Sequence, residues 1–131
     1  MIKATHAIID CINVSRDICI DDELLSNVLE NAAKMTNSKL IAKNRYRFGH
    51  NSPDGCTVVL MLDESHMSAH TYADNGKIAF DIFISKPANI CEKAVNYILE
   101  ELKIETYKVE YINRFLQIVE SNEHYLTRKT V

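Results

Sequence analysis

The residues best suited to chemistry lie in one polar decapeptide, residues 63–72, which runs Asp-Glu-Ser-His-Met-Ser-Ala-His-Thr-Tyr. Hydroxyl, imidazole and carboxylate side chains of this kind serve as nucleophiles, general bases and acids. The decapeptide follows an apolar run at residues 58–62 and precedes another at 78–84, and both runs are typical of buried strands. A segment this polar is expected to contribute little to a core, so we consider it a candidate active site.

The pair Glu64-Ser65 suggests one particular reaction. A serine hydroxyl can attack the carbonyl carbon of the preceding peptide if the backbone is strained and the oxyanion is stabilised. The N-to-O acyl shift gives an ester, which is eliminated when the serine α-proton is removed. The product hydrolyses to a pyruvoyl group at a new N-terminus and releases ammonia. On residue type alone, however, a serine at a strand end is usually structural.

The residues from Glu64 to Tyr72, together with Asp81-Ile82-Phe83, resemble the processing-site motif of the small prokaryotic S-adenosylmethionine decarboxylases. The family motif runs roughly Glu-Ser-His-aliphatic-Ser/Thr-Ile-His-Thr-Trp-Pro-Glu, followed by an apolar strand that ends in Asp-aliphatic-aromatic-Thr-Cys-Gly. Residues 53–85 match by motif, whereas the rest of the chain matches in the order of its elements. In this chain Tyr72-Ala73-Asp74 replaces Trp-Pro-Glu.

The resemblance implies self-cleavage between Glu64 and Ser65, which would leave a β chain of residues 1–64 and an α chain of residues 65–131. Ser65 would become a pyruvoyl cofactor, whose ketone forms a Schiff base with the α-amine of S-adenosylmethionine and takes up the electrons released with carbon dioxide. The product would be the aminopropyl donor for spermidine synthesis, a step in polyamine biosynthesis. The resemblance also implies that two processed protomers pair as a homodimer.

Two further residues are implicated in processing by the resemblance. His70 is the expected base for removal of the serine α-proton, a task that suits a neutral imidazole. Thr57 keeps a hydroxyl near a position where the family carries a serine that assists processing, although threonine is also an ordinary residue at a strand start. Side chains alternate along a strand, so Ser65 and His70 would face opposite sides of it. The base role therefore requires a bend or bulge between them, or a histidine from a partner chain.

Ser85 stands where the family has the cysteine that returns a proton to the substrate, and Lys86 replaces the family glycine. A serine hydroxyl is a far weaker acid than a thiol, whose pKa is about 8.5. We therefore expect proton return to be slower or less faithful. Cys56 could take over this role only if the fold brings it near.

Two candidate residues for substrate binding follow from the resemblance. Glu64 could face the cationic end of the substrate. Phe48 is the candidate to stack on the adenine ring, although residues 49–52 separate it from Pro53 by more than the family spacing.

A metal site at His66 and His70 is not expected. Their spacing equals that of H-E-x-x-H, but Met67 stands where the glutamate should be, and an extended segment keeps the two imidazoles apart. Orientation of the pyruvoyl group is the preferred role for His66. Asp81, an acid inside an apolar strand, is expected to be a buried, hydrogen-bonded structural group.

Composition indicates an ordinary globular protein of one domain, residues 1–131, with 47% apolar and 25% charged residues. A net charge of −3 gives no reason to expect nucleic acid or an anionic membrane as partner. No apolar run approaches the roughly 20 residues that span a bilayer, and the N-terminus has no signal-peptide pattern. Four scattered cysteines indicate reduced thiols in the cytoplasm.

The expected elements alternate strands and helices. Helices are predicted from residue 22 to about 36 and after Pro87, and the tail 113–131 could form a short docked helix. Strands are predicted at residues 4–13, 39–48, 56–63, 77–85 and 105–112. This order indicates an α+β two-layer sandwich, a mostly antiparallel sheet with helices on one face.

Three alternatives to the leading interpretation remain. The substrate could be another amino acid, such as ornithine or arginine, because position 85 and the loop after Phe48 depart from the family. The chain could also be a non-processing relative that acts as a regulatory or binding partner. The third alternative is a ligand-binding α+β domain without catalytic activity.

Overall fold

Six antiparallel strands form one sheet in the computed structural model, which describes residues 3–115. The strand order across the sheet is β2-β3-β4-β5-β1-β6, so the two hairpins in the middle of the chain build its centre. The elements, in chain order, are β1 (Thr5–Ile12), α1 (Arg16–Cys19), α2 (Asp22–Met35), β2 (Leu40–Phe48), β3 (Gly55–Leu62), β4 (Ser65–Tyr72), β5 (Lys77–Ile84), α3 (Ala88–Glu101) and β6 (Thr106–Asn113).

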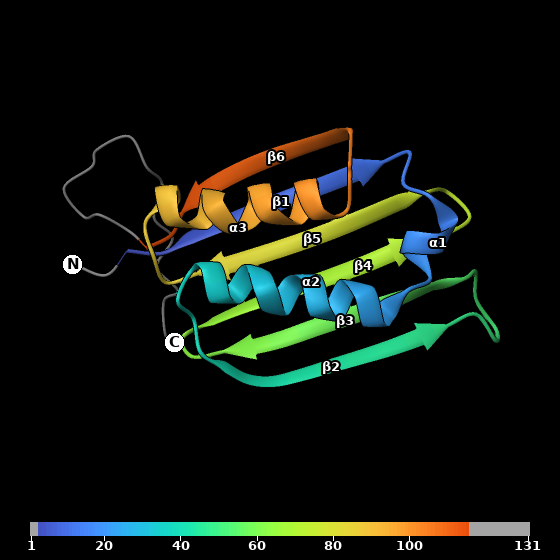
Figure 1. The fold of residues 1–131 in the computed structure, drawn as a ribbon, viewed down its shortest axis with the longest axis horizontal. Helices are drawn as coiled ribbons and strands as arrows, with labels where there is room; N and C mark the ends of the chain where they lie inside the picture. Colours follow the sequence, from blue (N-terminus) through green and yellow to red (C-terminus); the bar gives the residue numbers. More distant parts are fainter. Residues whose placement is uncertain (1–2, 116–131) are drawn as a thin grey trace, which may run out of the picture.

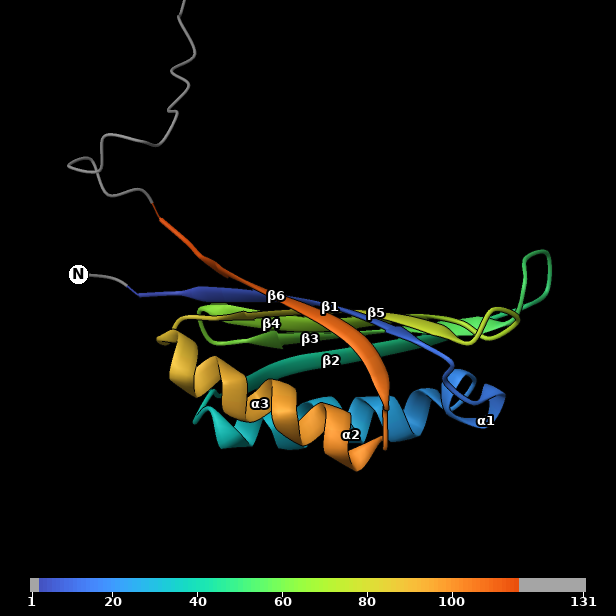
Figure 2. The ribbon, with the colours of Figure 1, turned by 90° about the horizontal axis from the view of Figure 1, so that it is seen from above.

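The three helices of residues 3–115 lie on the same side of the sheet, and no helix of this described part covers the other side (Figures 1 and 2). Helix α2 packs over β2 and β3, and α3 packs over β1 and β5. The core lies between these layers and contains fully buried Leu25 and Leu29 of α2 and Ile98 of α3. The predicted α+β two-layer sandwich is confirmed.

The expected helix at residues 22–36 forms as α2 because its start is capped and its apolar residues recur on one face. The side chain of Asp21 accepts a hydrogen bond from the backbone N–H of Leu24 at 2.9 Å, which satisfies one of the free donors at the helix start. The short helix α1 was not predicted. Its Arg16 forms ion pairs with Asp54 and Asp74 and so ties two loops together.

The polar decapeptide is itself a strand, and the expectation that it contributes little to the core is wrong. Strand β4 pairs with β3 on one side and β5 on the other. Its alternate residues Met67, Ala69 and Thr71 are fully buried beneath the helices. Thr71 can be buried because its hydroxyl donates to the Cys19 carbonyl and accepts from the Cys56 N–H. Because side chains alternate along a strand, a largely polar segment can still contribute every second residue to the core.

The opposite side of the sheet, which we call the open face, carries the other residues of each strand. Part of it is apolar: Tyr46, Val59, Met61 and Tyr72 are exposed there. Asp81 also lies on this face and bonds to His6 Nε2 at 2.9 Å. The expectation that Asp81 is buried is wrong, since 40% of its side chain is exposed, because its face of the sheet is not covered within the described residues.

Most of the helix expected at 113–131 lies outside the described residues. Within residues 3–115, no helix is long and apolar enough to cross a membrane.

Gly55, the first residue of β3, permits a close approach of neighbouring chain segments. A Cβ atom there would lie 2.3 Å from the carbonyl oxygen of Thr71 and 2.7 Å from the ring of Phe48. We therefore expect Gly55→Ala to lower the free energy of unfolding by about 1–3 kcal/mol through overpacking, measured by urea unfolding. Ser52→Ala in the exposed neighbouring loop is the control, expected within about 0.5 kcal/mol of wild type. An unchanged midpoint for Gly55→Ala would contradict the close approach.

Candidate active site

The bond between Glu64 and Ser65 lies in the tight turn that joins β3 to β4. Leu62 pairs with Ser65, so only Asp63 and Glu64 form the turn. Glu64 adopts a φ of +61°, a left-handed conformation that costs a residue other than glycine about 1–3 kcal/mol. The Asp63 N–H donates to the Lys39 carbonyl at 2.9 Å and anchors the turn. Backbone strain is therefore located directly at the predicted cleavage site.

Ser85, the first residue after β5, contacts both sides of this bond. Its backbone N–H donates to Ser65 Oγ at 3.0 Å, and its hydroxyl donates to the carbonyl oxygen of Glu64 at 2.5 Å. The bend that holds Ser85 is fixed from β1, where the buried Thr5 hydroxyl donates to the Lys86 carbonyl at 3.0 Å. The structure thus places Ser85, the residue at the family's proton-donor position, beside Glu64 and Ser65.

Thr57 and His70 form a second cluster, opposite each other on β3 and β4. Thr57 Oγ1 and His70 Nδ1 lie 3.0 Å apart, within hydrogen-bonding distance. Both side chains belong to the open face and are half-buried.

This second cluster lies far from Ser65 of the same chain. Ser65 and His70 are five positions apart on an unbroken strand, a span of about 16 Å, and the pairing of β4 with both neighbours has no register shift. The bend or bulge that would bring His70 to Ser65 is absent from this described strand. If His70 is the processing base, it must therefore come from a partner chain.

Phe48 belongs to the end of the sheet that holds His70. It pairs with Gly55 across β2 and β3, and its ring lies against the Gly55 backbone. Like His70, it is therefore distant from Ser65 of its own chain. The two tentative substrate-binding residues, Glu64 and Phe48, lie at opposite ends of β3.

An aromatic cluster beside Ser65 was not predicted. The His66 ring stacks on Phe83, its neighbour on β5, with ring centroids 5.4 Å apart and planes inclined by 11°. The Arg114 guanidinium lies 5.4 Å from the same ring, and His6 meets it edge-on. These residues come from three strands and from the chain after β6, and strand pairing brings them together. Only the register between the strands could have predicted this cluster. Alternation places His66 and Phe83 on the open face.

The cysteines do not reach this site. Cys56 is fully buried at the far end of β3 from Ser65, and burial raises the pKa of its thiol. Burial also raises the pKa of Cys11 to about 12 and that of Cys91 to about 11. The possibility that Cys56 replaces the family's acidic cysteine within one chain is thus unsupported by its position.

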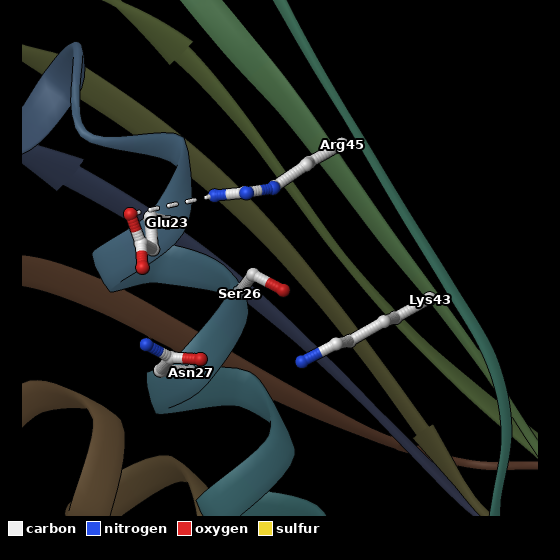
Figure 3. A pocket seen from close by; sticks show the side chains of 5 residues that line it. All are labelled: Glu23, Ser26, Asn27, Lys43 and Arg45. Carbon is white, nitrogen blue, oxygen red and sulfur yellow. Dashed lines mark ion pairs between the residues drawn. The ribbon is translucent and has the colours of Figure 1, made fainter.

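A cavity of about 180 Å³ lies elsewhere, between α2 and β2 (Figure 3). Its cations are already paired: Arg45 lies 3.5 Å from Asp22 and 4.0 Å from Glu23, and Lys43 lies 3.6 Å from Glu30. It opens on the helix side of the sheet and shares no residue with the clusters around Ser65 and His70. Within residues 3–115, no three His, Cys, Asp or Glu side chains converge as metal ligands.

Together, the fold and the strained Glu-Ser turn define an α+β protein with a candidate self-cleavage site. The family model for S-adenosylmethionine decarboxylase matches residues 5–115. The chain therefore belongs to the S-adenosylmethionine decarboxylase family, and the family predicted from the motif is confirmed.

Individual relatives agree with this assignment. The S-adenosylmethionine decarboxylase proenzymes of Thermodesulfovibrio yellowstonii and Brevibacillus brevis are each 31% identical to this chain, over 84% and 88% of it and 79% and 86% of their own lengths. An arginine decarboxylase proenzyme of Hyperthermus butylicus is 30% identical over 87% of this chain and 80% of its own. The crystal structure of the adenosylmethionine decarboxylase of Aquifex aeolicus matches with a TM-score of 0.78 and 26% identity, covering 93% of this chain and 98% of the other.

Thiol labelling tests the conclusion about the cysteines. All four are buried and free, so we expect Ellman's reagent to label none in the folded protein at pH 8 within minutes. The denatured protein is the control and should show four reactive thiols. Stoichiometric labelling of one thiol in the folded state would reveal an accessible cysteine and reopen the question of a cysteine acid.

Proposed function

We propose that this chain cuts itself between Glu64 and Ser65 and that the processed protein is a pyruvoyl-dependent decarboxylase of S-adenosylmethionine, which supplies the aminopropyl donor for spermidine synthesis. The observation that carries the proposal is the left-handed Glu64 directly before Ser65. Family membership supports the substrate. The four buried free thiols suit the reducing cytoplasm, where we expect the enzyme to act.

Processing begins with the hydroxyl of Ser65. Its Oγ attacks the carbonyl carbon of Glu64, the C–N bond breaks, and the hydroxyl proton passes to the released nitrogen. The strain at Glu64 is relieved as the planar peptide is lost, which lowers the barrier. A base then removes the α-proton of Ser65, and the ester is eliminated to leave Glu64 as a carboxylate. Water replaces the nitrogen, and ammonia departs with the pyruvoyl group complete.

The pyruvoyl group, once formed, supplies an electron sink for decarboxylation. The residues around it bind and orient the substrate. His66 and Phe83 present stacked rings beside position 65, and Glu64 remains the candidate for the cationic end of the substrate. Ser85 stays adjacent to position 65, but its hydroxyl is a weak acid for proton return.

A homodimer supplies what one chain lacks. His70, Thr57 and Phe48 lie at the other end of the sheet from Ser65, and they share the open face with exposed apolar side chains. Antiparallel pairing of two open faces would bring the His70 end of one protomer to the Ser65 end of its partner. It would also bury the apolar part of this face, the dominant driving force for association. In this arrangement the partner supplies the processing base, which would approach the backbone of Ser65 from the open face, opposite to the Ser65 side chain.

Arginine is the second candidate substrate. A relative named arginine decarboxylase proenzyme is 30% identical, close to the identities of the S-adenosylmethionine enzymes. Ser85 and the long loop after Phe48 also depart from the family motif. A non-processing role is less well supported, because Ser65 and His70 are both retained.

Intact mass tests the cleavage. We expect the single chain of 15.0 kDa to give two fragments divided between Glu64 and Ser65, the second blocked at its N-terminus. Ser65→Ala, which lacks the nucleophile, should stay uncut and is the control. An uncut wild-type chain would refute autonomous processing.

Turnover of the processed protein then separates the substrates. Release of carbon dioxide is measured with S-adenosylmethionine, arginine and ornithine in parallel. We expect S-adenosylmethionine to give the highest kcat/KM, whereas a preference for arginine would establish the second candidate.

Complementation tests whether His70 acts in trans. Neither Ser65→Ala nor His70→Ala should yield a pyruvoyl-terminated fragment alone. When the two chains are co-expressed with tags of different mass, we expect the His70→Ala chain to be processed by the histidine of its partner. Failure of the mixed dimer, with dimer formation shown by native mass, would mean that His70 acts within its own chain or not at all.

A further inference from the structure

We infer that Arg16 is a positioning residue for substrate binding, because it holds the segment that carries Phe48, the candidate to stack on the adenine ring. The inference rests on the proposed function, in which Phe48 of one protomer serves the Ser65 site of its partner. Arg16 is the first residue of α1. It acts through other residues, and the contacts of its guanidinium show which ones.

The Arg16 guanidinium binds two carboxylates from different segments. It donates to Asp74 Oδ1 at 2.8 Å and to Asp54 Oδ2 at 2.5 Å. Asp54 ends the loop between β2 and β3, and Asp74 lies in the turn between β4 and β5. An isolated surface ion pair contributes little, but a guanidinium that bridges two acids fixes their geometry. Without Arg16, the two carboxylates that share its charge would repel each other.

The backbone on both sides of Arg16 is anchored to the same end of the sheet. Before it, the Val14 N–H donates to the Gly76 carbonyl at 2.9 Å. After it, the Cys19 carbonyl at the end of α1 accepts a hydrogen bond from the buried Thr71 hydroxyl of β4. Arg16 therefore extends from a fixed base, so the carboxylates that it binds are restrained relative to the sheet.

Asp54 passes this restraint to Phe48. Its carboxylate packs so closely against Gly49, the residue after Phe48, that a Cβ atom at Gly49 would collide with Asp54 Oδ1. Gly49 has a φ of +139°, which glycine adopts readily and other residues do not. Asp54 also directly precedes Gly55, whose backbone lies against the Phe48 ring. A displaced Asp54 would therefore release the contacts on both sides of Phe48.

Thr57 and His70 do not depend on Arg16 in this way. They pair with each other inside β3 and β4, and the hydrogen bonds of the two strands fix their positions. Loss of Arg16 should therefore weaken substrate binding and leave self-cleavage intact.

Steady-state kinetics of processed Arg16→Ala test this separation. We expect the KM for S-adenosylmethionine to rise about 10-fold, since a small misplacement of a binding group costs that much or more. The extent of cleavage and kcat should stay near wild type, because a contact remote from the reacting atoms contributes to uniform binding. Arg16→Lys keeps the charge without the planar fork and should fall between the two. Arg45→Ala is the matched control: Arg45 is 46% exposed against 50% for Arg16, and it pairs with acids of α2.

Mixed dimers show which protomer needs Arg16. Co-expression of a Ser65→Ala chain with a His70→Ala chain leaves one working site, which combines Ser65 of the second chain with His70 and Phe48 of the first. Homodimers of either chain should be inactive. Arg16→Ala added to the first chain should raise KM about 10-fold, whereas the same change in the second chain should leave KM unchanged.

Every other result decides against the inference. A rise in KM that is equal for both chains, or confined to the second, would indicate a general structural defect and overturn it. An unchanged KM in Arg16→Ala, or slowed cleavage or a lower kcat at unchanged KM, would also overturn it while leaving the proposed function intact. A wild-type chain that is not cut, or that does not decarboxylate S-adenosylmethionine, would instead refute the proposed function on which the inference rests.

Discussion

The unbroken pairing of β4 with both of its neighbours is the constraint on which the rest of the structure depends. It keeps residues 65–72 extended, so alternate side chains serve two different purposes. One set, Met67, Ala69 and Thr71, completes the core beneath the helices. The other set, which includes His66 and His70, lies on the open face. The strand thus holds its histidines in place on the open face while its other residues pack in the core.

The same pairing determines where strain can reside. A regular strand cannot store backbone strain at Ser65, so the unfavourable φ falls on Glu64, the last residue of a turn closed by the Leu62–Ser65 pair. Burial of the strand residues on both sides holds the turn closed. Because the strained Glu64 directly precedes Ser65, the stability of the sheet maintains strain at the peptide bond where we propose cleavage.

Much of this was predictable from the sequence, and the failures have physical reasons. Helix α2 follows from local capping at Asp21 and from apolar residues that recur on one face. The contribution of residues 65–72 to the core was missed because polarity was weighed above alternation. The Ser85 contacts and the ring stack of His66 on Phe83 depend on register between strands, which no local pattern specifies. The burial predicted for Asp81 failed because the helices of residues 3–115 cover only the opposite face of the sheet.

Position 85 is where the departure from the family motif has the clearest chemical consequence. The Ser85 hydroxyl donates a hydrogen bond to the carbonyl oxygen of Glu64, and a hydroxyl is a good donor. After cleavage the family motif requires an acid there, and a thiol is the far better acid. Since the chain's four cysteines are buried with raised pKa values, no nearby thiol of the same chain compensates. Proton return at position 85 of the proposed enzyme therefore depends on a hydroxyl, which is a weak acid.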